Sequence, residues 1–311
     1  MGKKQRYFHW FLRNVPSSLS MRLFHKAKPL SKWKGKKGPT LEETDEALCR
    51  ALDSSSPFAA IRFGAVELSC LNNHEKIELG LKKHYKSSVV YSMKNNAGFF
   101  PTDEASLKKY GDCLLPLLGE ADFLGISGVH MEEYFQEFYC PKASIILYEG
   151  FEPLHGNWSH HLAGKKILVV SPFAAQIEEQ YKKRDELFPL DSGILPEFTL
   201  LTIKAPLTCA DGTVEGSSFF EELSKMEKAM ANLDFDVALI GAGAYGTFLA
   251  LEAKRLGKQS IQTGGATMTL FGLMGKRWEK REHVAKFVNQ SWSRPYEKPT
   301  GYEKIEGGAY W

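Results

Sequence analysis

Short apolar runs alternate with longer amphipathic stretches along most of this chain of 311 residues. The apolar runs are rich in Val, Ile and Phe and are typical of buried strands, whereas the stretches between them have the length and spacing of helices. Strands that alternate with helices pair in parallel, because each helical crossover returns the chain to the same edge of the sheet. The sequence therefore predicts an α/β protein with a Rossmann-like, mostly parallel sheet and helices on both faces.

We expect these elements to form one domain over residues 41–311. The strands are predicted at 59–63, 88–93, 122–127, 144–148, 166–171, 198–203, 236–241 and 259–264. The helices are predicted at 41–52, 65–73, 103–118, 131–138, 172–187, 217–231, 245–256 and 279–289. The last segment is too aromatic for a free end, so we expect it to dock onto the domain through Trp292, Tyr302, Tyr310 and Trp311.

Residues 1–40 form a basic arm and linker ahead of this domain. They carry eleven of the 40 Lys and Arg residues and no acidic residue, which leaves 40 − 11 = 29 basic against 37 acidic residues in the remainder. A nucleic-acid-binding domain is basic on its folded surface, so no nucleic-acid partner is expected. Aromatic residues interleave with the cations, which suits adsorption of residues 1–37 to an anionic membrane surface. A solvated or loosely docked extension is an equally good interpretation.

The cysteines and the hydropathy pattern indicate in which cellular compartment the protein is expected. No apolar stretch is long enough to cross a bilayer, and the first residues do not form a secretory signal. The five cysteines are odd in number, widely spaced and without a Cys-x-x-Cys pair. This argues against a disulfide framework or a cysteine-bound zinc ion and for a reducing environment. We expect a cytoplasmic protein, free or peripheral at the inner face of the plasma membrane.

The stretch GAGAYG at 241–246 lies between a predicted strand and a predicted helix. Gly241 and Gly243 allow a tight turn and close approach of a ligand, and Gly246 allows the helix to pack closely on the strand. The start of the helix favours an anion such as a diphosphate. A dinucleotide site also needs an acid at the end of the next strand, but 262–265 read Gln-Thr-Gly-Gly. NAD is therefore not expected, and a purely structural glycine turn is the alternative to a diphosphate site.

A second turn, RFG, ends the strand predicted at 59–63. Arg62 points to the face opposite Ile61, and Glu67 falls in the first turn of the following helix, where the helix dipole stabilises a carboxylate. Arg62 suits a phosphate or pyrophosphate, and Glu67 suits a divalent cation or a sugar hydroxyl. A buried structural ion pair between the two is the alternative.

Other candidates lie at further corners of the chain. Asn95 and Asn96 suit sugar hydroxyls at a strand end, although Asn-Asn-Ala-Gly is also ordinary turn chemistry. Lys276 and Arg277 suit a departing diphosphate or, equally, the end of a helix. Residues that could line a site but have simpler surface or helix roles are Gln180, Arg184 and His155, the last also a weaker candidate base.

These motifs resemble those of the GT-D-fold glycosyltransferases, a bacterial group. The matching features are the R-F-G-x-x-E turn at 62–67, the strand-glycine-helix unit at 236–257 and a following strand that ends in glycines. The chain is closer still, over nearly all of 41–311, to bacterial proteins found with polysaccharide genes. The shared phrases are NAGFFP, GAGAYG, LFGLMGKRW and a terminal YW.

The resemblance implies transfer of a sugar from a nucleoside-diphosphate donor to a glycan or lipid-linked acceptor in surface polysaccharide or glycoconjugate assembly. Arg62 and Glu67 would be catalytic. The donor would be bound by Gly64, Asn95, Asn96, Gly241, Gly243, Tyr245, Gly246, Gly264, Gly265, Lys276 and Arg277. The family holds Mn²⁺ or Mg²⁺ with an Asp-x-Glu pair, but Ala65 replaces the Asp here, so a metal at Glu67 would need ligands from substrate and water. A catalytically inactive nucleotide- or carbohydrate-binding protein and a nucleotide-dependent oxidoreductase are the alternatives.

Overall fold

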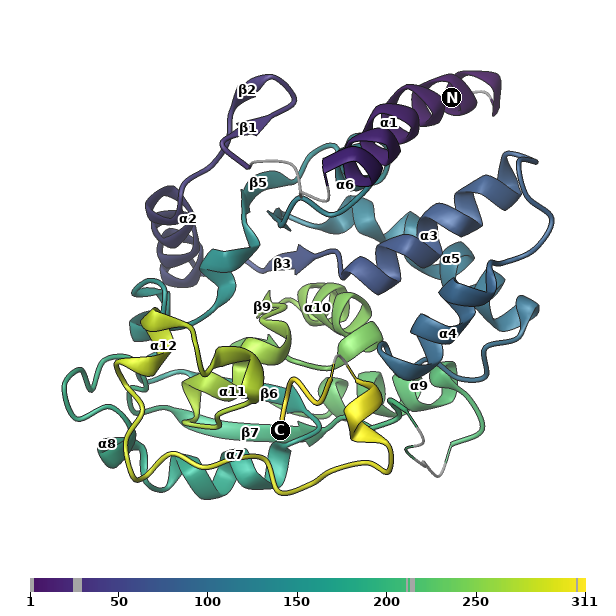
Figure 1. Cartoon of the computed structure of the whole chain (residues 1–311). Coiled ribbons are helices and arrows are strands. Elements are labelled where there is room, and N and C mark those ends of the chain that lie inside the picture. Colours follow the sequence, from purple (N-terminus) through teal and green to yellow (C-terminus); the bar gives the residue numbers. More distant parts are fainter. Residues whose placement is uncertain (1–2, 25–29, 211, 213–215, 306) are drawn as a thin grey trace.

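A seven-stranded parallel sheet forms the centre of the molecule (Figure 1). The computed structural model describes residues 3–24, 30–210, 212, 216–305 and 307–311, with only the backbone described at residues 3 and 15–24. The strands lie in the order β5-β4-β3-β9-β8-β6-β7, and every neighbouring pair is parallel. They are β3 (Phe58–Arg62), β4 (Phe123–Ile126), β5 (Ser144–Leu147), β6 (Lys166–Ser171), β7 (Thr199–Lys204), β8 (Val237–Ile240) and β9 (Gln259–Ile261).

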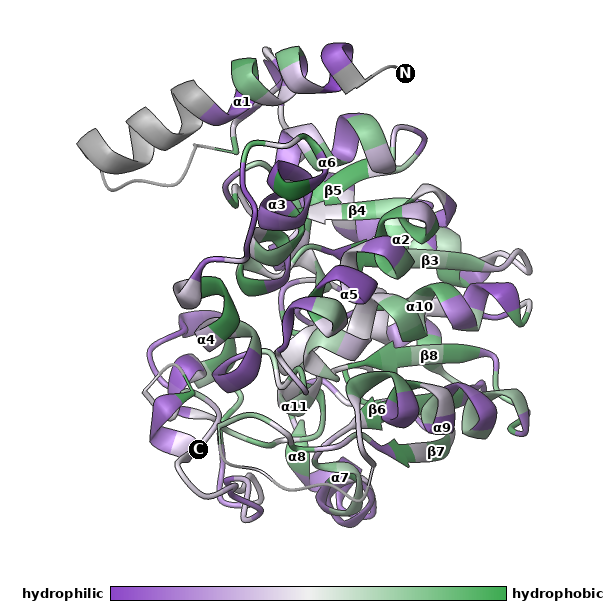
Figure 2. Ribbon diagram, turned by 90° about the vertical axis from the view of Figure 1, so that its right-hand side faces the viewer, coloured by the Kyte–Doolittle hydropathy of each residue, from purple (hydrophilic) through white to green (hydrophobic). Residues whose placement is uncertain are grey.

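Successive residues of the strands enter two separate hydrophobic cores. In β3, Ala59 and Ile61 belong to one core, and Phe58 and Ala60 belong to the other. A strand buried on both faces favours apolar residues throughout, as in β3 and β8, and the buried Gln259 and Ser260 of β9 donate hydrogen bonds to backbone carbonyls. Figure 2 shows hydrophobic residues along the strands and hydrophilic ones on the outer sides of several helices.

Helices cover both faces, as the sequence predicts. The first core is completed by α3 (Ala65–Glu78), α4 (Ser87–Asn95), α5 (Glu104–Leu117), α6 (Glu132–Tyr139), α9 (Phe219–Ala231) and α10 (Gly246–Arg255). The second is completed by α2 (Leu41–Asp53), α7 (Ala174–Tyr181), α8 (Arg184–Leu187), α11 (Thr267–Leu270), α12 (Glu282–Ala285) and the segment 290–311. The α/β, Rossmann-like prediction is confirmed at this level.

The strand predicted at 88–93 is wrong, because this stretch forms helix α4. Val89 and Met93 are four residues apart and buried, whereas Tyr91 between them is 57% exposed. That spacing places one side of a helix on the core. Packing therefore outweighs the strand preference of Val-Val-Tyr. The Asn95–Asn96 corner follows a helix, and not a strand as predicted.

Two predicted helices are shorter in the structure. The helix predicted at 172–187 divides into α7 and α8, and that predicted at 279–289 reduces to α12. Helix α7 lies beside residues 291–294, whose backbone accepts hydrogen bonds from Gln176 and Gln180.

Helix α1 (Lys3–Phe24) docks one side against α3 and α6 (Figure 1). Arg6 is bound by the buried Glu75, and Trp10 donates a hydrogen bond of 2.9 Å to Asn72 Oδ1. This part of the arm is therefore packed on the body. The exposed side carries Tyr7, Phe8, Phe11 and Leu12. Among the described helices, none is both long and apolar enough to cross a membrane.

Candidate functional site

A cavity of about 80 Å³ lies where β3, β6, β8 and β9 end at the carboxyl edge of the sheet. Ligands of open parallel sheets bind at this edge. The predicted residues that line the cavity are Arg62, Asn96, Gly241, Gly243, Gly264 and Gly265. The Arg62 turn and the GAGAYG turn therefore face one space, although nearly 180 residues of chain separate them.

Arg62 ends β3 and has a guanidinium whose Nε donor is unsatisfied. Its backbone N–H donates to Gln262 Oε1 at 3.0 Å, and its Cζ lies 5.2 Å from the centre of the Tyr148 ring. The Nε atom is buried and has no hydrogen-bond partner, and the described residues provide no ion pair to the guanidinium. The Arg62–Glu67 ion pair considered from the sequence is thus not formed. A buried donor without a partner costs about 1–3 kcal/mol, which an incoming anion would recover.

Glu67 lies beside Arg62 but outside the cavity lining. A Cβ at Gly64 would lie 1.9 Å from Glu67 Oε2 and 2.7 Å from Arg62 Nη1, so both side chains close on this glycine. Among the described residues, two groups of side chains are close enough together to hold a metal ion, one around His155 and one around His74. Glu67 belongs to neither group. Ala65 is exposed and offers no ligand. These residues do not fit Mg²⁺ or Mn²⁺, which need several oxygen ligands.

The glycine turns bring the ends of β8 and β9 together beside Arg62. Gly243 and Gly264 have φ values of +52° and +60°, which other residues rarely adopt. A Cβ at Gly241 would lie 2.5 Å from the carbonyl oxygen of Gly264, and one at Gly264 would lie 3.1 Å from Arg62 Nη2. Glycine at these positions keeps the space beside the guanidinium open.

Two residues of the GAGAYG turn serve packing. A Cβ at Gly246 would lie 2.7 Å from Gln262 Nε2, so helix α10 approaches β9 closely, as predicted. The Tyr245 ring stacks on Phe219 with 4.2 Å between ring centres. Gln262 also accepts a hydrogen bond from Thr247, so the side chain at the position of a ribose-binding acid is engaged within the protein.

The remaining predicted residues lie outside the lining. Asn95 is buried and donates to the carbonyl oxygen of Tyr91. Arg277 lies over the Tyr310 ring at 5.2 Å, and Lys276 next to it is exposed. The side chains that engage other parts of the protein are Gln180 with Ser291, Arg184 with Glu197, and His155 with His283.

Sequence reasoning missed the other residues that line the cavity, among them Cys209, Tyr310 and Trp311. Burial raises the pKa of the Cys209 thiol to about 12, so it is not a thiolate nucleophile at neutral pH. Docking of the two aromatic residues was expected, but their position over this cavity was not. A space of about 80 Å³ equals the volume that two or three water molecules occupy in liquid water. A phosphate group fits it, whereas a nucleotide requires Tyr310 and Trp311 to move.

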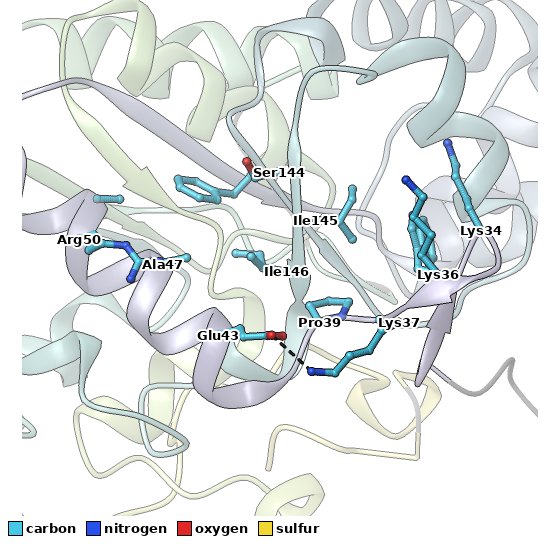
Figure 3. Close-up of a pocket in the computed structure, with 14 residues that line it drawn as sticks. Lys34, Lys36, Lys37, Pro39, Glu43, Ala47, Arg50, Ser144, Ile145 and Ile146 are labelled. Carbon is cyan, nitrogen blue, oxygen red and sulfur yellow. Dashed lines mark ion pairs between the residues drawn. The ribbon is translucent and has the colours of Figure 1, made fainter.

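A second, open cavity of about 820 Å³ lies between α2, β5 and the antiparallel hairpin of β1 (Lys32–Trp33) and β2 (Lys36–Lys37) (Figure 3). Its cations are Lys34, Lys36, Lys37 and Arg50. Glu43 is its one acidic side chain among the described residues and pairs with Lys37 at 3.6 Å. The cavity is therefore basic, with an apolar floor that includes Ile145 and Ile146.

No protein-family model, curated protein or solved structure matches the chain. Its function therefore has to be inferred from the geometry of these cavities and the chemistry of the side chains that line them.

Proposed function

We propose that the chain is a GT-D-type glycosyltransferase that binds the diphosphate of a nucleoside-diphosphate sugar at the Arg62 cavity, in surface polysaccharide or glycoconjugate assembly. The observation that carries the proposal is the unpaired Arg62 guanidinium between two glycine turns at the carboxyl edge of a parallel sheet. Arginine binds phosphate oxygens through paired N–H groups, and glycine turns let the ligand approach the backbone.

The proposed reaction breaks the bond between the anomeric carbon and a diphosphate oxygen. A hydroxyl oxygen of a glycan or lipid-linked acceptor forms the new bond to that carbon and passes its proton to a base. Negative charge develops on the departing diphosphate, where Arg62 stabilises it. Glu67, beside Arg62, is the proposed base. Asn96 Oδ1 is buried without a hydrogen-bond partner and suits a hydroxyl of the donor.

A ligand screen by thermal shift tests this proposal. UDP, GDP, CDP and dTDP are compared with NAD and NADP, each with and without Mn²⁺. We expect one nucleoside diphosphate to raise the melting temperature, because a ligand at 100 times its Kd adds about 2.7 kcal/mol of stability. A rise with NAD alone would contradict the proposal. Binding of a nucleotide sugar without release of nucleoside diphosphate would identify an inactive binding protein.

Nucleotide binding is also expected to loosen residues 307–311. A cavity of about 80 Å³ is too small for a nucleotide, and one wall is held by hydrogen bonds from Arg277 N–H to Ala309 O (2.9 Å) and from Trp311 Nε1 to Glu297 O (2.6 Å). Hydrogen exchange at these residues should therefore rise in the presence of the nucleoside diphosphate identified by the screen. Inorganic phosphate, which fits without rearrangement, is the control. Unchanged exchange with bound nucleotide would place the nucleotide elsewhere.

We also propose that α1 and the basic hairpin attach the protein to an anionic membrane. Arg13 of α1 and Lys34 of the hairpin both contact Glu137 of α6, at 3.3 and 3.8 Å, so the two elements are neighbours. The exposed aromatic side of α1 suits the acyl boundary, and the lysines of the hairpin suit anionic headgroups. A lipid-linked acceptor would be within reach of such a protein.

Replacing the exposed apolar side chains of α1 by serine is expected to reduce vesicle binding at least tenfold, because insertion of apolar surface supplies much of the affinity. The variant is Tyr7→Ser, Phe8→Ser, Phe11→Ser and Leu12→Ser together, measured by sedimentation with vesicles of phosphatidylserine and phosphatidylcholine. The control is Tyr91→Ser with Leu190→Ser, which removes exposed apolar side chains elsewhere. Equal binding by wild type and both variants would remove the membrane proposal.

A further inference from the structure

Two histidines and a glutamate from distant parts of the chain converge on one point outside the Arg62 cavity. Glu152 and His155 follow the short helix η2 (Tyr148–Phe151), and His283 lies on α12. One ligand atom from each lies within 4.8 Å of the others. His283 Nε2 is 2.9 Å from Glu152 Oε2, and His155 Nε2 is 3.9 Å from the same oxygen. The two imidazole rings stack with 3.6 Å between their centres.

This cluster has more acceptors than donors. His155 Nε2 is buried and has no hydrogen-bond partner, while carboxylate oxygens of Glu149 and Glu152 lie 3.4 and 3.9 Å away. Imidazole nitrogens and carboxylate oxygens that gather at one point are the ligand atoms that bind transition-metal cations.

We propose that Glu152, His155 and His283 bind a divalent transition-metal ion of the zinc class, with Glu149 or water as the fourth ligand. Zinc takes imidazole nitrogen and carboxylate oxygen at about 2.0–2.2 Å, so the ligand atoms of a tetrahedral site are about 3.3 Å apart. The separations of 2.9, 3.4 and 3.9 Å among the four side chains bracket that value. Because an imidazole binds a metal in its ring plane, the two rings, now stacked at an interplanar angle of 27°, have to rotate apart for both Nε2 atoms to bind one ion.

A second cluster of possible metal ligands, His74 with Glu78 and Asp112, differs from the first in that a lysine already pairs with its carboxylates. There Lys108 Nζ lies 3.2 Å from Glu78 and 3.0 Å from Asp112, so an ammonium group already supplies the positive charge. At the first cluster the described ion-pair partners of Glu149 and Glu152 are His155 and His283, and no described lysine or arginine forms an ion pair with either glutamate. The metal proposal therefore applies to the first cluster alone, and the second provides a control.

The chemistry of the ligands also distinguishes this site from the Arg62 cavity. Histidine ligands favour zinc and its neighbours in the transition series over Mg²⁺, which prefers carboxylate, phosphate and water. The bound ion would tie residues 149–155 to α12, and through α12 to the segment 290–311. The proposed metal site does not depend on the proposed function, so it holds whether or not the protein transfers sugars.

Titration of the wild-type protein with Zn²⁺ after treatment with a chelator tests the proposal by calorimetry. We expect one equivalent to bind and to raise the melting temperature. His283→Gln and Glu152→Gln should each weaken binding at least tenfold, whereas Asp112→Asn should bind as wild type does. Co²⁺ in place of Zn²⁺ should give the visible absorption of a tetrahedral site, which His155→Gln should abolish.

Two further measurements test Zn²⁺ binding without depending on the folding of the histidine and Glu152 variants. Glu149 is about half exposed, so Glu149→Gln tests the fourth ligand with little risk to the fold. Imidazole resonances of the wild-type protein need no substitution, and two of them should shift on addition of Zn²⁺. Failure of the wild type to bind Zn²⁺, or equal affinity in His283→Gln and Asp112→Asn, would overturn the proposal.

Discussion

Arg62→Ala is expected to weaken nucleoside-diphosphate binding by roughly 100-fold or more while leaving the fold about as stable as before. The loss follows because the guanidinium is the charged donor that lines the cavity, and charge-assisted bonds to phosphate are strong. Stability should change little, because removal of the unsatisfied Nε donor offsets the loss of the contact between the guanidinium and the Tyr148 ring. Calorimetry for binding and urea unfolding for stability measure the two effects separately.

The two outcomes separate a ligand site from a structural arginine. If Arg62 only braces the turn, Arg62→Ala should lower stability and leave nucleotide affinity unchanged, which would contradict the proposed function. Arg62→Lys keeps the charge but not the planar fork, so intermediate affinity is expected. Arg184→Ala removes a surface arginine that pairs with Glu197 and should bind nucleotide as the wild type does. Residual turnover by Arg62→Ala should fall with binding, because the charge on the departing diphosphate loses its counter-charge.

The parallel sheet and the position of the cavity were predictable from local patterns. The strand runs at β3 and β8 are apolar up to Arg62 and Gly241, and the more polar run at β9 leads into Gly264 and Gly265. In a parallel sheet those corners share one edge, so Arg62 and the 241–246 turn had to lie on the same side. That deduction needs no knowledge of which strands are neighbours.

The contacts made by remote segments were not predictable. Tyr310 and Trp311 cover the cavity because 290–311 packs along α7 and α11, which no local pattern specifies. The same holds for His155, which was expected as a lining residue or a base. Its partner His283 lies more than 120 residues further along the chain, and stacking of the two depends on how α12 packs.

The error at α4 has a different origin. Val-Val-Tyr has a local preference for strand, but the buried pair Val89 and Met93 has the spacing of a helix. The spacing of the apolar residues over a longer stretch of sequence favours a helix over a strand here. The Asn95–Asn96 corner was chosen as a site because of the mistaken strand, yet Asn96 lines the cavity through the turn that follows α4.

Glu75 holds α1 to the body through a buried cluster of charge-assisted hydrogen bonds. Its side chain is fully buried and accepts from Arg6 Nε (3.1 Å) and Arg6 Nη2 (2.5 Å). Tyr139 donates to it at 2.8 Å, and Tyr134 makes a further short hydrogen bond. Burial, and next the Glu75 carboxylate, raise the pKa of both tyrosines, so they remain protonated donors. Every described donor in the cluster therefore depends on the negative charge of Glu75.

Glu75→Gln should consequently destabilise the protein by about 3–5 kcal/mol, because it leaves Arg6 without its counter-charge in a partly buried site. The melting temperature should fall by roughly 5–8 °C for a chain of this length. Glu78→Gln on the same helix is the matched control: Glu78 is 42% exposed and pairs with Lys108, so its loss should cost less than about 1 kcal/mol. Arg6→Ala combined with Glu75→Gln should be less harmful than the sum of the single changes, since each removes the same interaction.

Additive effects of Arg6→Ala and Glu75→Gln on the free energy of unfolding would mean that α1 is held by its apolar contacts and by Trp10. The charge pair would then be incidental to docking of the helix. Loss of vesicle binding by Glu75→Gln, with the exposed side of α1 intact, would in turn show that the membrane surface depends on α1 being docked in this orientation.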